Sequence, residues 1–200
     1  SFEAEKTFVM DALPDVSRVL PSPVFSKFAF ASGAATQYAD AMLHAAFPQA
    51  GEWHTLLGKP QIKPIKIDIP VGYGYILTSR KDNAAFAVAD VEFVQKELFR
   101  RLPKQPGKLV IAVTHNTAYY ALGDATVCCS WGTHGVDSTT GNSFVLASYL
   151  HAAPAVVEDG DIQPLTQQLA EFVIDPLHDP LVHGRNGKGP GNVFPAWMRP

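Results

Sequence analysis

The chain has 200 residues, of which 46% are hydrophobic, and its formal net charge is −3. This length and apolar content favour one globular domain with a core, and the slight negative charge argues against nucleic acid or an anionic membrane as a partner. No apolar run approaches the roughly 18 residues needed to cross a bilayer, so no transmembrane segment is expected.

The first part of the chain is expected to hold an arm, a helix and two strands. Residues 1–24 carry several prolines among apolar positions, which predicts an extended N-terminal arm or a strand with turns. Residues 33–47 predict a helix that Pro48 ends. Residues 61–70 alternate apolar and polar side chains, as in a half-buried strand, and residues 73–78 continue as strand.

The second part of the chain predicts two further helices and two further strands. A helix is expected over residues 88–101, because its apolar residues recur on one face. Residues 108–114 form a continuous apolar run that is typical of a fully buried strand, and residues 144–150 predict another strand. The last helix is expected over residues 161–174, with Asp161 as its N-cap. The apolar face of the helix at 88–101 consists of Val91, Val94, Leu98 and Phe99.

The order of these elements favours an α+β fold. A mixed β-sheet flanked by about three helices fits them better than an all-α or all-β domain. We therefore expect a single globular domain over residues 25–180, after the arm at 1–24. Residues 181–200 are rich in glycine and proline and are read as a tail.

The last predicted helix has the spacing of a zinc-hydrolase helix. Gln167 and Glu171 are four residues apart and project from one face, as do the two metal ligands of a His-Glu-x-x-His or His-Glu-x-x-Glu helix. The first ligand position holds Gln167, and the general-base position holds Gln168. A carboxamide cannot take a proton from zinc-bound water near neutral pH, and it is a weak ligand beside imidazole or carboxylate. Its apolar stripe is expected to be buried, and consists of Leu165, Leu169 and Phe172.

The segment at residues 167–177 resembles the His-Glu-Leu-Ala-Glu segment, followed by Asp-Pro-Leu, of secreted zincin-like proteins related to plant EXORDIUM and the phosphate-induced proteins. Three upstream pieces resemble that family in the same order, at residues 102–116, 128–135 and 144–149. The resemblance implies a zincin-like single domain of metallopeptidase-related fold and a secreted or extracytoplasmic location. The first residues lack a signal-peptide pattern, as a mature secreted protein would.

The resemblance and the histidines of the chain together give the candidate site residues. Glu171, His134 and Gln168 are the candidate catalytic residues, and the resemblance places the glycine-flanked turn that carries His134 near the active cleft. Glu171, His178 and His183 are the candidate metal ligands, although the spacing of the two histidines matches no established ligand geometry. No cofactor is expected, with zinc as the alternative. His115, at the end of the buried strand, is read as a surface or hydrogen-bonding residue.

Two functions remain open. The first is a degenerate zincin-like pseudoenzyme that has lost a metal ligand and its general base, and that binds a small molecule or peptide or has a structural role. The second is an active hydrolase, with relocated metal ligands or with non-metal catalysis by His134, Glu171 or Asp175 in the same cleft. Loss of both the ligand and the base favours the first.

The cysteines Cys128 and Cys129 are adjacent in the sequence. A disulfide between neighbours requires a strained turn, so buried thiols or pairing with other sequence are expected instead. No second cysteine or histidine cluster lies at ribbon or finger spacing, which argues against a structural zinc site of that kind.

Overall fold

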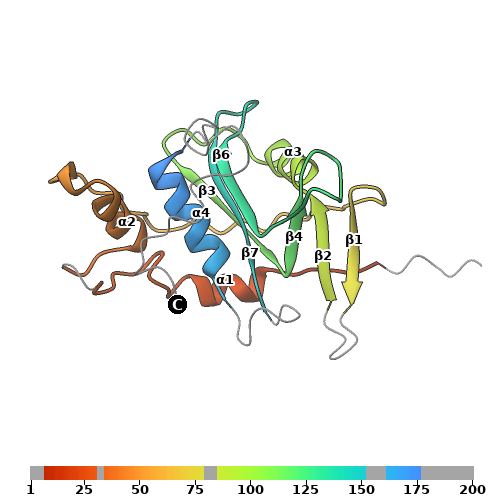
Figure 1. The fold of residues 1–200 in the computed structure, drawn as a ribbon, viewed down its shortest axis with the longest axis horizontal. Helices are drawn as coiled ribbons and strands as arrows, with labels where there is room; N and C mark the ends of the chain where they lie inside the picture. The colour runs from red at the N-terminus through yellow and green to blue at the C-terminus, as the bar shows by residue number, and fades with distance from the viewer. Residues whose placement is uncertain (1–6, 31–33, 79–84, 152–160, 177–200) are drawn as a thin grey trace, which may run out of the picture.

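The computed structural model describes residues 7–30, 34–78, 85–151 and 161–176. Within these residues the chain forms four α-helices, one short 3-10 helix and seven strands in two mixed sheets, which confirms the expected α+β fold (Figure 1). The helices are α1 (Leu13–Val19), α2 (Tyr38–Ala46), the 3-10 helix η1 (Pro48–Ala50), α3 (Val91–Arg101) and α4 (Gln163–Ile174). The strands are β1 (Gly74–Thr78), β2 (Ala85–Asp90), β3 (Leu109–His115), β4 (Thr117–Tyr120), β5 (Cys128–Ser130), β6 (Gly132–Val136) and β7 (Ser143–Tyr149).

The three-stranded sheet is the centre of the molecule and has the order β3-β7-β6. Strand β7 pairs in parallel with β3 and antiparallel with β6, so β6 is an edge strand. Because side chains alternate along β7, its two faces build two different cores. Val145 and Ala147 pack with α4, whereas Phe144 and Leu146 pack with α3. Figure 1 shows α4 and α3 on either side of this sheet, with α2 beyond α4.

The four-stranded sheet has the order β1-β2-β4-β5 and lies beside the first. The chain passes from β3 to β4 at Asn116, whose φ of 41° is left-handed. Asparagine tolerates this conformation better than most residues. The N–H of Thr117 then donates to the Ser148 Oγ at 2.8 Å, which ties β4 to the end of β7.

Helices α3 and α4 match their predictions. Asp90 caps α3, because its Oδ1 accepts the N–H of Phe93 at 2.7 Å. Residue Ile162, not Asp161, is the N-cap of α4, although the Asp161 Oδ1 accepts the N–H of Gln163 at 2.8 Å. The predicted apolar faces lie in the two cores: Val94, Leu98, Phe99, Leu165 and Leu169 are buried, and Val91 and Phe172 are half-buried.

Two predictions for the first part of the chain are wrong. Residues 13–19 form α1 rather than an extended arm, with Pro14 in the first turn, where its missing N–H costs nothing. Val19 and Val24 are buried in the core beside α4. The strand expected over 61–70 is absent from this described segment, which pairs with no strand although its Ile65 and Ile67 pack against the core beside α3. Its prolines lack N–H groups, so they interrupt any ladder.

Other differences concern strands and cysteines. Residues 85–90 form β2, so α3 begins three residues later than predicted, and residues 132–135 are strand β6 rather than a turn. The strand at 109–115 is half-buried rather than fully buried. Cys128 and Cys129 are exposed and joined by a disulfide, contrary to the expected buried thiols. Among the described helices, none is long and apolar enough to cross a membrane.

Candidate functional site at the α4–β6 junction

Helix α4 and the edge strand β6 bring together the side chains that the sequence singled out. We call His134, Gln167, Gln168 and Glu171 the polar cluster. His134 comes from β6, and the other three come from two successive turns of α4. His134 is 34 residues from Gln168 in sequence, and the expectation that it lies against this helix is confirmed.

The polar cluster is a closed set of hydrogen bonds. The Nδ1 of His134 lies 2.9 Å from the Oε1 of Gln168 and 3.7 Å from the Oε2 of Glu171. The Gln168 Nε2 donates to the Glu171 Oε2 at 2.9 Å, and the Gln167 Nε2 donates to the Glu171 Oε1 at 3.1 Å. Both oxygens of Glu171 are therefore occupied by the two glutamines, and both ends of the Gln168 amide are used.

Both nitrogens of the His134 imidazole face hydrogen-bond partners. The Gln168 amide nitrogen faces Glu171, so its oxygen faces the Nδ1 of the ring. The Nε2 lies 3.1 Å from the backbone oxygen of Asp175, which accepts its N–H. Both ring nitrogens are therefore taken by partners within the protein, and a metal ion would have to displace one of them.

The approach of β6 to α4 depends on a small residue. A Cβ on Gly132 would lie 2.5 Å from the backbone oxygen of Leu146 and 2.9 Å from the Gln168 Cγ, so a larger residue would push the strand away. His134 is opposite Val145 in the β6–β7 register, which puts its side chain on the α4 face of the sheet. The side chain of His134 is 1% exposed, whereas that of Glu171 is 29% exposed.

The other predicted site residues are not in the polar cluster. Asp175 is buried and contributes its backbone oxygen. His115 pairs through Nδ1 with the Oδ2 of the buried Asp15 of α1 at 2.7 Å, which agrees with its hydrogen-bonding interpretation. The metal candidates His178 and His183 lie outside the described residues.

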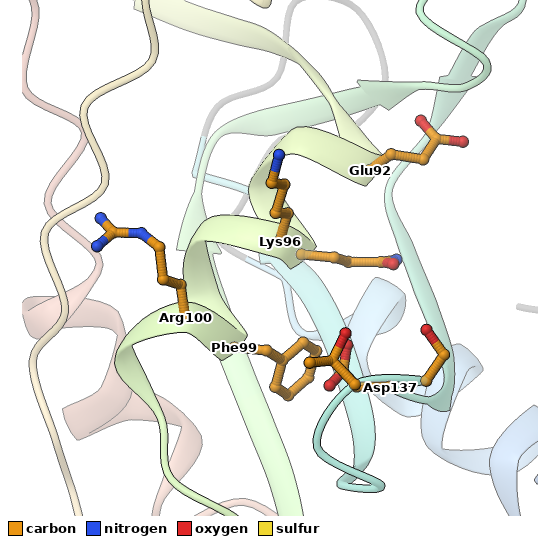
Figure 2. Close-up of a pocket in the computed structure, with 8 residues that line it drawn as sticks. Glu92, Lys96, Phe99, Arg100 and Asp137 are labelled. Carbon is orange, nitrogen blue, oxygen red and sulfur yellow. The ribbon is translucent and has the colours of Figure 1, made fainter.

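Two adjoining hollows lie between α3, β6 and the turn after β6. One, of about 400 Å³, separates α3 from the turn after β6, and Figure 2 shows Phe99 pointing from α3 toward the turn that carries Asp137. The second, of about 320 Å³, follows β6 itself, and His134 is among the residues that line it. Half of the residues around the first hollow are charged: Glu92, Lys96, Arg100 and Asp137.

One group with metal-binding chemistry was missed by the sequence analysis. Among the described residues, Asp40, His44 and His54 place one possible ligand atom each within 4.8 Å of the others. The available signal was the spacing of Asp40 and His44, which are four residues apart in a predicted helix, as Gln167 and Glu171 are. His54 had no sequence signal, because a turn of the chain brings it back to α2.

Comparison with known proteins gives no family. No protein-family model, curated protein or solved structure matches the chain.

Proposed function

We propose that this chain is a degenerate zincin-like protein, related to the metallopeptidases, that has lost zinc-dependent hydrolysis and has a binding or structural role. The observation that supports this most is the position of Gln168, whose amide bridges His134 and Glu171 at the place of the general base. A working zinc hydrolase needs a metal with an open coordination position and a base that accepts a proton from the bound water. The polar cluster provides no such base, because a carboxamide does not accept that proton, and its first ligand position holds a second carboxamide, Gln167.

The polar cluster instead has the chemistry of a structural clamp. It links the edge strand β6 to α4 through a hydrogen-bonded chain that begins at the backbone oxygen of Asp175 and ends at Gln167. A satisfied buried network of this kind fixes the relative position of two elements. In a binding role, the ligand would be a small molecule or peptide, and the hollows beside α3 are the concave surface that we assign to it (Figure 2). A secreted location, implied by the resemblance, remains part of this proposal.

The proposal is tested by restoring the missing chemistry. The double substitution Gln167→His and Gln168→Glu puts an imidazole and a carboxylate one turn from Glu171. It should create zinc affinity, measured by calorimetric titration, that the parent lacks at this site. Both proteins should carry His54→Gln, so that the group on α2 does not contribute. Zinc-dependent peptide hydrolysis by the parent, or zinc binding by the parent that Glu171→Gln removes, would contradict the proposal.

A further inference from the structure

Helix α2 also carries a pair of polar side chains that faces a histidine from another segment. Asp40 and His44 lie one turn apart on α2, and His54 follows η1. The Oδ1 of Asp40 lies 3.1 Å from the Nδ1 of His54 and 3.8 Å from the Nε2 of His44. The two imidazole rings have their centroids 5.4 Å apart and are inclined at 64°. Two imidazoles thus converge on one carboxylate oxygen, although a single ion pair needs only one.

The carboxylate of Asp40 is held in a fixed orientation. It is buried, with 1% exposure, and its Oδ2 accepts the hydroxyl of Thr36 at 2.7 Å. Its Oδ1 accepts the N–H of Thr55 at 2.8 Å. Partners of this kind orient a ligating carboxylate and limit its motion.

The segment that carries His54 is also held in place. The chain reverses after η1 at Gly51, whose φ of +61° favours glycine, and returns along α2. The side chain of Gln37 then donates to the oxygen of Leu57 at 3.0 Å and accepts its N–H at 2.6 Å. Hydrogen bonds at Thr55 and Leu57 therefore fix the backbone just after His54.

We propose that Asp40, His44 and His54 form a binding site for a divalent transition metal ion of the zinc class, with a fourth, solvent-facing position for water. Ligand atoms about 2.0–2.1 Å from zinc at tetrahedral angles lie about 3.3 Å apart. The Asp40 Oδ1 lies 3.1 Å from the His54 Nδ1 and 3.8 Å from the His44 Nε2, and the three ligand atoms lie within 4.8 Å of one another, so the two imidazoles need only a small movement to close on an ion. Two imidazoles and one carboxylate are a donor set that zinc accepts. The side chains of His44 and His54 are 33% and 56% exposed, so an ion reaches them from solvent.

This site shares no residue with the polar cluster and does not depend on the proposed function. A bound ion would join α2 to the segment after η1 and replace the hydrogen bond between His54 and Asp40. It would therefore fix the outer layer of the molecule, which Figure 1 shows beyond α4.

The test is calorimetric titration of zinc into the whole 200-residue chain and three single variants. The parent should bind one zinc per chain, and His44→Gln and His54→Gln should each weaken binding by at least about tenfold. His115→Gln is the matched control, because it removes an imidazole that also pairs with a buried aspartate but has no third ligand in the described residues. It should leave zinc affinity unchanged.

A second measurement avoids substitutions altogether. Zinc added to the unmodified protein should shift the ring nitrogen resonances of His44 and His54, and leave those of His134 unchanged. The proposal would be overturned by absence of zinc binding by the parent, by a zinc affinity of His44→Gln or His54→Gln equal to that of the parent, or by shifts confined to other histidines.

Discussion

Helices α2 and α4 carry polar side chains at the same four-residue spacing, but the two groups differ in their chemistry. Each carries two polar side chains four residues apart, and each pair meets a histidine from another segment. On α4 that histidine is His134, whose side chain is 1% exposed and whose two nitrogens face Gln168 and the backbone oxygen of Asp175. On α2 it is His54, whose side chain is 56% exposed and which meets a second imidazole. The spacing alone therefore does not define a metal site, because the donor atoms and their access to solvent decide the chemistry.

The electrostatics of the two helices differ in the same way. Burial raises the pKa of the Asp40 carboxyl, but hydrogen bonds from Thr36, Thr55 and His54 outweigh this effect, and the pKa is lower than usual. The anionic carboxylate on α2 is thus stabilised by donors that surround it. The Glu171 carboxylate on α4 is shared between two glutamine amides instead.

The largest expected loss of stability comes from truncating a buried side chain that packs α4 against the sheet. Leu169 is 1% exposed, so Leu169→Ala should lower the free energy of unfolding by about 2–5 kcal/mol. Ile174→Ala is the control on the same helix, because Ile174 is exposed and should cost less than about 1 kcal/mol. Urea denaturation measures both. Equal losses in the two variants would show that the buried stripe does not anchor α4.

The second prediction compares the stability lost when His134 or His54 is replaced by alanine. His134→Ala leaves the Gln168 Oε1 and the Asp175 oxygen without the donor that they share, and should cost about 1–3 kcal/mol. His54→Ala removes a half-exposed imidazole, while the Asp40 carboxylate keeps its hydrogen bonds from Thr36 and Thr55, so the change should cost less than about 1 kcal/mol in metal-free buffer. Chemical denaturation with a chelator present gives both values. If His54→Ala lowers the free energy of unfolding more than His134→Ala does, the polar cluster is not the structural clamp.

The third prediction compares the two carboxylates. Glu171→Gln replaces a half-buried acceptor and should cost about 1 kcal/mol, with no change in zinc affinity. Asp40→Asn should instead weaken zinc binding by at least about tenfold, since a carboxamide is a poorer ligand. Denaturation and calorimetry on the same samples test this contrast. Weaker zinc binding by Glu171→Gln than by the parent would indicate that zinc binds at α4.

The elements with a clear periodic signal were predicted from the sequence, and those set by tertiary contacts were not. The helices α3 and α4 have apolar stripes that match their buried faces, and both were located to within a few residues. Strand β6 was read as a turn because Gly132 and Gly135 flank His134, yet Gly132 is required by the close approach of α4. The apolar alternation at residues 61–70 predicted the inward side chains of Ile65 and Ile67, but not the exposure of Ile69 or the lack of strand pairing, since prolines interrupt the segment.

The candidate site was partly predictable for a similar reason. The spacing on α4 identified Gln168 and Glu171, and the resemblance added His134, which the fold brings to them. The closed state of the polar cluster depends on hydrogen-bond directions that no sequence pattern contains. The group on α2 was missed because His54 reaches Asp40 only through the reversal of the chain after η1.

The most direct test of the contrast between α2 and α4 is the location of zinc in crystals of the unmodified protein. An anomalous difference map recorded at the zinc absorption edge, after soaking in zinc, should show a peak between Asp40, His44 and His54. No peak is expected at the polar cluster, where both ring nitrogens of His134 face partners within the protein. A zinc peak bonded to Glu171 and His134 would contradict the contrast between the two helices, because it would show that α4 holds a metal.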